Sequence, residues 1–160
     1  MNDQQLTIKA QEETYPVEHQ QGGFVVSTDK SKLDIASIHD FLTHCYWSEG
    51  ISRATVEKAI AHSLCFGLYE REKQIGFARV VSDYTTYAYL CDVYVLESHR
   101  QKKLGTWMMS CVMAHPDLQG LRRFTLLTRD AHELYRKFGF SESKNPSRYM
   151  EIHDADVYKR

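Results

Sequence analysis

Three cationic side chains, those of Arg100, Lys102 and Lys103, lie within four residues, just before a predicted amphipathic helix. Gly105 and Thr106 fall in the first turn of that helix. The first amides of a helix have no partner within it, and the helix dipole is positive at that end, so the arrangement is typical of an anion site for phosphate or pyrophosphate. The stretch has neither the GxxxxGK nor the GxGxxG pattern. Taken alone, it equally fits solvated charges before an ordinary helix.

A second informative segment is a helix predicted further along the chain. Ala131, Leu134, Tyr135 and Phe138 share one face of it, and Gly139 is placed to end it. On spacing alone, Tyr135 is a core aromatic side chain.

Taken in order, these segments resemble the GNAT superfamily of acyl-CoA-dependent N-acetyltransferases. The resemblance spans residues 24–152 and is carried by Asp92-Val93-Tyr94-Val95, Arg100-x-x-x-x-Gly105 and Ala131-x-x-Leu134-Tyr135-x-x-Phe138-Gly139-Phe140. The family motif Gln/Arg-x-x-Gly-x-Gly/Ala falls on Arg100, Lys103 and Gly105, with lysine in place of the first glycine. Thr128 stands where many members have asparagine.

The resemblance implies acetyl-CoA as cosubstrate and direct attack of a neutral amine on its thioester. The acceptor would be a small molecule or an amino acid-like compound. The implied cofactor-binding residues are Val93, Tyr94 and Val95 beside the pantetheine, Arg100, Gln101, Lys102, Lys103, Leu104, Gly105 and Thr106 around the pyrophosphate, and Thr128, Ala131 and Tyr135. Tyr135 would lie beside the cofactor sulfur, where a phenol can protonate the departing thiolate.

The general base is harder to place. Asp92 is the carboxylate on the predicted strand 87–96, which makes it a candidate catalytic residue. Strand alternation predicts that its side chain points away from the face of Tyr89. A buried aspartate that anchors a loop by hydrogen bonds is the alternative, and it is the commoner role. Candidates for the acceptor site, chosen by position alone, are Asp83, Tyr84, Trp47 and Glu49, for which ordinary loop and cap chemistry is the alternative.

Periodicity predicts one mixed α/β domain, and the resemblance implies a central sheet flanked by helices, with strands splayed at the cofactor site. This domain covers residues 23–160, and the polar residues 1–22 form a loosely held segment before it. The expected strands are 24–28, 64–69, 74–81, 87–96, 124–127 and 148–152, and the expected helices begin at a Ser31–Asp34 capping box, near Ser52, at Leu104 and at Ala131.

The composition of the chain argues against several functional classes. The 160 residues carry 20 Lys and Arg against 21 Asp and Glu, so the chain lacks the basic surplus of a protein that coats nucleic acid or anionic membrane. The four cysteines are spaced by 20, 26 and 20 residues and form no CxxC, so we expect reduced thiols and no metal site. The N-terminal sequence does not have the layout of a signal peptide, which leads us to expect a cytoplasmic protein.

Alternatives stay open on these data. The lysine at position 103 favours an acyl-CoA-binding regulatory domain without turnover, and the anion loop also fits a mononucleotide- or phosphate-binding protein. A homodimer is equally open. Because left-handed backbone costs a lysine roughly 1–2 kcal/mol, we expect Lys103 in right-handed or extended conformation.

Overall fold

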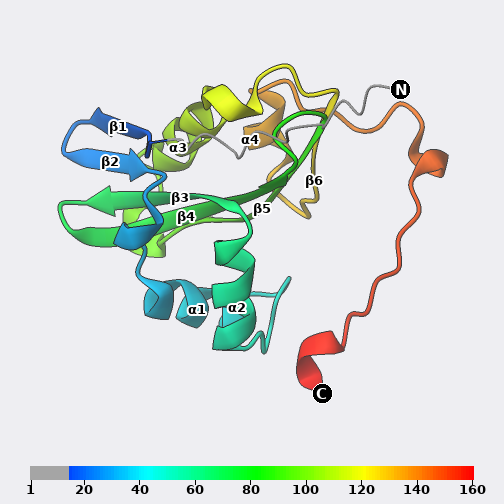
Figure 1. Ribbon diagram of the computed structural model, residues 1–160, viewed down its shortest axis with the longest axis horizontal. Coiled ribbons are helices and arrows are strands. Elements are labelled where there is room, and N and C mark those ends of the chain that lie inside the picture. Colours follow the sequence, from blue (N-terminus) through cyan, green and yellow to red (C-terminus); the bar gives the residue numbers. More distant parts are fainter. Residues whose placement is uncertain (1–14) are drawn as a thin grey trace, which may run out of the picture.

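The computed structural model describes residues 15–160, which form one six-stranded sheet with helices on both faces (Figure 1). The strands are β1 (Glu18–Gln21), β2 (Phe24–Ser27), β3 (Leu64–Glu70), β4 (Lys73–Ser82), β5 (Tyr87–Val95) and β6 (Arg123–Leu126), in that spatial order. Neighbouring strands are antiparallel except β5 and β6, which are parallel. The predicted mixed α/β fold is confirmed. It gains a strand at its start, because β1 lies within the segment 1–22 that we expected to be loosely held.

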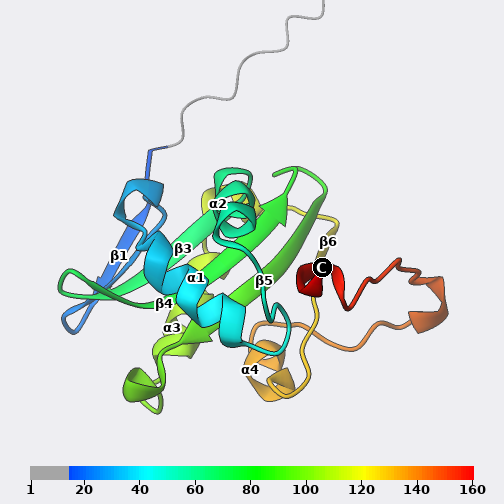
Figure 2. The ribbon, with the colours of Figure 1, turned by 90° about the horizontal axis from the view of Figure 1, so that it is seen from below.

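Four helices cover the two faces of the sheet. On one face lie α1 (Ile35–His44) and α2 (Arg53–Ala61), and on the other lie α3 (Leu104–Met113) and α4 (His132–Arg136) (Figures 1 and 2). Phe77 and Tyr94 belong to the core beneath α1 and α2, whereas Leu68, Leu90 and Met108 belong to the core on the α3 side. The central strands are therefore buried on both faces, which explains their long apolar runs.

The first helix begins later than its sequence pattern suggests. The side chain of Asp34 accepts a hydrogen bond from the amide of Ser37, at 3.0 Å, and the helix starts at Ile35. Ser31 lies instead in a short 3₁₀ turn, where its amide donates to the carboxylate of Asp29 at 2.9 Å. The predicted Ser31–Asp34 capping box is thus wrong, because each aspartate caps the turn that directly follows it.

A β-bulge interrupts β5 where it pairs with β4. Phe77 lies opposite Tyr94 and Arg79 lies opposite Cys91, which leaves Ala78 facing two residues, Asp92 and Val93. Asp92 adopts a positive φ of 53°, a conformation that non-glycine residues seldom take. The bulge reverses the order in which side chains alternate between the two faces. Even-numbered Leu90 faces the α3 core before it, whereas even-numbered Tyr94 faces α1 after it.

The parallel pairing of β5 with β6 stops halfway along β5. It joins Tyr87–Leu90 to Arg123–Leu126, and β5 then continues through Cys91–Val95 without a β6 partner. The two strands therefore part at Leu90 and Leu126. On that side the backbone of residues 91–94 has no strand partner and is open to another group, whereas the carbonyl of Val95 accepts from the side chain of Arg100.

The last twenty residues form no strand. Two 3₁₀ turns, at Pro146–Arg148 and Val157–Lys159, interrupt an otherwise irregular segment, residues 141–160, which we call the arm. After α4 the arm curves away from the sheet and then returns to the side of α2 (Figure 1). The strand predicted at 148–152 is therefore wrong for the isolated chain, because an extended segment becomes a strand only when a neighbouring strand pairs with it.

Candidate functional site

The loop between β5 and α3 has the backbone geometry of an anion site. A 3₁₀ turn, Glu97–His99, leads into residues of alternating φ sign: Gln101 has φ 66°, and Lys103, which caps α3, is left-handed with φ 59° and ψ 18°. Alternation of this kind turns successive amides toward one point and forms an anion-binding concavity. The first amides of α3 lie beside it and lack partners within the helix. The expectation that Lys103 avoids left-handed angles is wrong, because the chain reverses direction at this residue as it enters α3.

The three cations of this loop have different surroundings. Arg100 is turned back onto the sheet, where its Nε donates to the carbonyl oxygen of Val95 at 3.2 Å. Lys102 places its ammonium 5.9 Å from the ring centre of Phe24. None of the three is in an ion pair among residues 15–160, and Lys103 has neither a hydrogen bond like that of Arg100 nor a ring contact like that of Lys102. Lys103 is therefore the cation most available to a ligand.

The space around Gly105 fits a phosphate-bearing ligand. A Cβ placed on Gly105 would meet one side chain of the protein within 4 Å, that of Val95, at 3.8 Å. The fold itself does not demand a glycine there, because the space is open. It is, however, the space that a pyrophosphate would need to reach the amides of α3. Leu104 is buried in the core, so only its backbone is available.

The parted strands supply the second half of this site. Val93 and Val95 are half-buried and lie on the unpaired stretch of β5. Tyr94 is buried, and its ring stacks on Phe41 with 3.7 Å between ring centres, so its side chain faces α1 and only its backbone can take part. Unpaired strand backbone followed by the first amides of a helix offers the hydrogen-bonding groups that the pantetheine and pyrophosphate of coenzyme A would need.

Tyr135 lies on α4 against the α3 core, close to the end of β6. It is 8% exposed, and this burial raises the pKa of its phenol to about 12. The phenol is therefore protonated at neutral pH and can act as a proton donor. Thr128 supports the turn into α4, since its hydroxyl accepts from the amide of Ala131 at 3.0 Å. Threonine here caps the turn as asparagine would.

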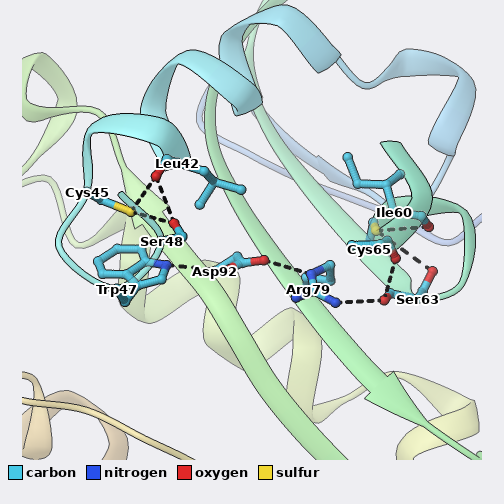
Figure 3. Close-up of polar contacts among 10 residues, drawn as sticks. Leu42, Cys45, Trp47, Ser48, Ile60, Ser63, Cys65, Arg79 and Asp92 are labelled. Carbon is cyan, nitrogen blue, oxygen red and sulfur yellow. Dashed lines mark hydrogen bonds and ion pairs between the residues drawn. The ribbon is translucent and has the colours of Figure 1, made fainter. Parts of the chain in front are cut away.

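Asp92 is engaged by two donors. Its Oδ2 accepts from Nε of Arg79 at 2.7 Å, and its Oδ1 accepts from the indole of Trp47 at 3.2 Å (Figure 3). Arg79 also donates to the hydroxyl of Ser63, at 3.1 Å. Both carboxylate oxygens are thus occupied, and the geometry favours an anchor over a general base.

The expected face of Asp92 is wrong. Its carboxylate lies on the side of α1 and α2, where Trp47 contacts it and its partner Arg79 contacts Ser63, and this is also the side of Tyr89. The cause is the bulge, which puts two residues of β5 opposite Ala78 and breaks the alternation on which the prediction depended.

The candidate acceptor residues fall into two groups. Trp47 and Glu49 lie in the loop between α1 and α2, beside the parted strands. Asp83 and Tyr84 lie at the opposite end of β5. There the Asp83 carboxylate accepts from the amides of residues 85–87, and these bonds hold its pKa far below the usual range. Asp83 is a turn residue and is not brought to the site.

The structure adds residues that sequence reasoning missed. Arg129, in the loop after β6, places its guanidinium 3.8 Å from the ring centre of Tyr46, and Tyr46 meets Trp47 edge to face at 5.1 Å. These contacts join the loops on the two sides of the parted strands. Arg79 was missed as well, although a charged residue inside the apolar run 75–81 is itself a signal of a buried ion pair.

A cavity of about 640 Å³ lies along the outer edge of β6. Tyr89 of β5, Thr128 and Tyr135 line its inner side, and Tyr149 and Met150 of the arm line its outer side. We call it the arm cavity. It brings the predicted proton donor and the aromatic residues of β5 to one space, as an acceptor site requires.

Residues 15–160 form neither a side-chain cluster suited to a metal ion nor a helix suited to crossing a membrane. No group of three or more His, Cys, Asp or Glu side chains in this range is placed to hold a metal ion. In the same range, no helix has the length and apolar character needed to cross a membrane.

The chain is similar to an acetyltransferase family and to proposed members of it along most of its length. Residues 35–140 match the Acetyltransferase (GNAT) family. FG08082 of Gibberella zeae, whose name proposes it as an acetyltransferase, is 31% identical in an alignment 147 positions long that covers 78% of this chain and 82% of that protein.

Solved structures agree with this match. A Xanthomonas campestris pv. campestris protein, described as a proposed acetyltransferase of the GNAT family, is 48% identical with a TM-score of 0.85, over 88% of this chain and all of that one. SA2161 of Staphylococcus aureus is 24% identical with a TM-score of 0.64, over 82% of this chain and 99% of that one, and shows the fold alone. These matches agree with the parted strands and with the loop between β5 and α3, and they show that the chain belongs to the GNAT acetyltransferase family.

Proposed function

We propose that this chain transfers the acetyl group of acetyl-CoA to an amine of a small-molecule or amino acid-like acceptor. The observation that carries the proposal is the place where β5 and β6 part, with free strand backbone on one side and the protonated phenol of Tyr135 close to the end of the other. Acetyl-CoA supplies an activated thioester when it is bound there.

The loop before α3, the edge of β5 and Tyr135 each have a role in this reaction. The amides of residues 101–106, with the ammonium of Lys103, hold the pyrophosphate, and the free edge of residues 93–95 orients the pantetheine by hydrogen bonds. Backbone donors on that edge stabilise the negative charge that develops on the carbonyl oxygen. Tyr135 gives its proton to the departing thiolate.

Asp92, the carboxylate of β5, is held by Arg79 and Trp47 and is therefore poorly placed to act as the base. We infer that the acceptor amine arrives neutral and that water accepts its proton after attack. This route predicts a rate that rises with pH as more of the amine loses its proton.

The test incubates the protein with acetyl-CoA and a panel of amines and detects the acetylated product by mass spectrometry. Mass detection avoids the background that the chain's own cysteines give in thiol assays. Product with at least one amine supports the proposal. Coenzyme A binding without product from any amine class would favour the acyl-CoA-binding alternative, and absence of binding at millimolar acetyl-CoA would overturn both.

A further inference from the structure

Arg129 lies in the loop between β6 and α4 with its charge largely unneutralised. Its side chain is 65% exposed, and its ion-pair partner within residues 15–160 is the neighbouring Asp130, with 3.8 Å between the charged atoms. An exposed pair at this distance is weak, because water screens the attraction. The guanidinium of Arg129 therefore remains available to an anionic group of a ligand.

The same guanidinium is held against an aromatic ring. Its central carbon lies 3.8 Å from the ring centre of Tyr46, which is van der Waals contact and suits the parallel stacking of two flat groups. A stacked guanidinium uses its flat face, whereas its N–H groups point outward in the plane. The contact with Tyr46 thus leaves the edge of Arg129 free to donate two parallel hydrogen bonds to a carboxylate.

Tyr46 is itself connected to the sheet. Its ring meets Trp47 edge to face at 5.1 Å, and the indole of Trp47 donates to the carboxylate of Asp92 at 3.2 Å (Figure 3). These contacts run from the bulge of β5, through the loop between α1 and α2, to the guanidinium on the other side of the parted strands. A side chain fixed in this way loses less conformational entropy on binding a ligand than a free surface arginine would.

Arg129 is also near the phenol that we propose as the proton donor. It directly follows Thr128, which lines the arm cavity together with Tyr135. Burial contributes most to the raised pKa of Tyr135, and Tyr46 and Asp130 add to the rise, which places both of them near the phenol. The stacking partner and the next residue of Arg129 therefore lie within reach of the reacting groups. A small molecule can reach both places at once.

We propose that Arg129 binds a carboxylate of the acceptor, so that the acceptor is a small amine that also carries a carboxylate. This inference rests on the proposed acetyl transfer: the amine faces the thioester beside Tyr135, while the carboxylate accepts two hydrogen bonds from the guanidinium. Tyr46 is a positioning residue, because it acts on the acceptor through the stacked arginine.

Other arginines near the site are less suited to this role. Arg79 pairs with Asp92 at 2.7 Å, and Arg136 pairs with two glutamates. Arg123 lies at the start of β6, where its guanidinium is 5.8 Å from the ring centre of a tyrosine of the arm. The strands part at the opposite end of β6, and Arg129 is the arginine that follows this end.

Matched pairs of acceptors give the first test. The probes are α-amino acids and ω-amino acids of increasing length, each compared with the carboxamide of the same compound, with product measured by mass spectrometry. We expect kcat/KM to be about 10- to 100-fold higher for the preferred carboxylate than for its carboxamide. The carboxamide's amine is less basic and more of it is neutral at a given pH, so amine protonation opposes the expected preference.

Variants then assign the preference to Arg129. Arg129→Gln should remove it, mostly through KM, because the carboxylate lies away from the reacting amine. Arg129→Lys should restore part of it, since lysine keeps the charge without the flat fork of donors. Arg122→Gln is the matched control: it removes the same charge from an exposed arginine before the start of β6 and should leave the preference intact.

Tyr46 provides a test that a purely structural role of Arg129 would not satisfy. Tyr46→Phe keeps the ring and should behave as wild type. Tyr46→Leu removes the ring and should reduce the preference for carboxylates while the rate with carboxamides stays within about threefold. Calorimetric titration should give the same coenzyme A affinity in all of these variants, because Arg129 is assigned to the acceptor.

A binding measurement distinguishes failure of this inference from failure of the proposed function. Saturation-transfer NMR in the presence of coenzyme A, which has no acetyl group to transfer, should detect the carboxylate of the preferred pair and lose it in Arg129→Gln. If no amine is acetylated, the proposed function fails, and this measurement still decides the role of Arg129.

Four outcomes would overturn the inference. Three of them leave acetyl transfer intact: equal rates with carboxylates and carboxamides, a preference that survives in Arg129→Gln, and a loss of coenzyme A affinity in Arg129→Gln with an unchanged preference, which would assign the arginine to the cofactor. The fourth is the absence of binding of every carboxylate probe at millimolar concentration.

Discussion

Arg79 and Asp92 form an ion pair that ties the bulge of β5 to β4, with 2.7 Å between Nε and Oδ2. The side chains are 18% and 13% exposed, so the pair is mostly shielded from water. Through Ser63 and Trp47, the same pair also reaches the end of α2 and the loop after α1. This one contact therefore holds together the elements that frame the parted strands.

Asp92→Asn should destabilise the protein by about 2–4 kcal/mol, somewhat less than the loss of a fully buried partner, because it leaves the Arg79 charge without a counterion. Arg79→Gln should cost a similar amount. The double variant should lose at least about 1 kcal/mol less than the sum of the two, as measured by urea unfolding, because the two residues interact directly. Additive losses would show that the ion pair is not what these side chains contribute.

Asp92→Asn also tests whether Asp92 is a structural anchor or the general base of the reaction. Asparagine keeps an oxygen that can accept from Trp47, so kcat at saturating acceptor should fall less than about 10-fold, whereas loss of a general base costs about 10²–10⁴-fold. A fall of that larger size, with its pH dependence abolished, would restore Asp92 to the catalytic role.

Tyr135→Phe should lower kcat by about 10²–10⁴-fold with little change in coenzyme A affinity, since the ring still packs while the proton donor is lost. Steady-state kinetics and calorimetric titration measure the two quantities. Tyr15→Phe, which removes the hydroxyl of an exposed tyrosine, is the control and should behave as wild type. An unchanged rate, with chemistry shown to be rate-limiting, would reduce Tyr135 to a packing residue.

The raised pKa of Tyr135 should also make the free energy of unfolding depend on pH above pH 10. Burial raises its pKa from 10 to about 12, so the folded state holds the phenolic proton more tightly than the unfolded state. The resulting stabilisation is complete below pH 10 and is lost as pH rises toward 12, to a maximum of about 2.7 kcal/mol for a shift of two units. Tyr135→Phe should lose less stability than wild type between pH 10 and 12 in denaturant unfolding. Equal losses in the two proteins would contradict a raised pKa.

Lys103→Gly and Lys103→Ala distinguish the effect of the left-handed backbone at this position from the effect of the side-chain charge. Glycine relieves left-handed strain of roughly 1–2 kcal/mol and gives back about 0.5–1 kcal/mol in chain entropy, so Lys103→Gly should raise the free energy of unfolding by about 0.5–1 kcal/mol. Lys103→Ala keeps the strain and loses the ammonium, so it should weaken coenzyme A binding about 10-fold at low salt and less at high salt.

Titration of both variants at two salt concentrations provides the measurement. Wild-type affinity in Lys103→Ala at low salt would make the ammonium a bystander. Tighter binding in Lys103→Gly than in wild type would show that the lysine limits access to the loop amides.

The sequence predicted those features that depend on regular repeats. Leu104, Met108, Cys111 and Val112 follow helical spacing, and all four are buried in the core. The continuous apolar run of β5 likewise predicted a strand covered on both faces, because a regular ladder makes side-chain direction readable from residue order.

The wrong predictions concern positions where the backbone is irregular and segments whose structure depends on a neighbouring element. The bulge places Asp92 on the face opposite to the predicted one, and the residue types of an apolar strand do not indicate where a bulge will form. Lysine at position 103 gives no hint of a left-handed angle, since the entry into α3 imposes it. Residues 148–152 have the composition of a strand, but composition does not supply a partner.

The bulge at Asp92 adds one residue to β5 without changing the face that the later side chains meet. Leu90 and Tyr94 are four positions apart and would share a face in a regular strand, but they lie in opposite cores because Asp92 and Val93 together oppose Ala78. Deleting Asp92 would restore regular pairing, with Val93 opposite Ala78, and would keep Tyr94 on the side of Phe41 and Val95 beside the start of α3. The deletion would instead remove the carboxylate that Arg79 and Trp47 contact, so the extra residue of β5 serves this anchor and not the placement of its neighbours.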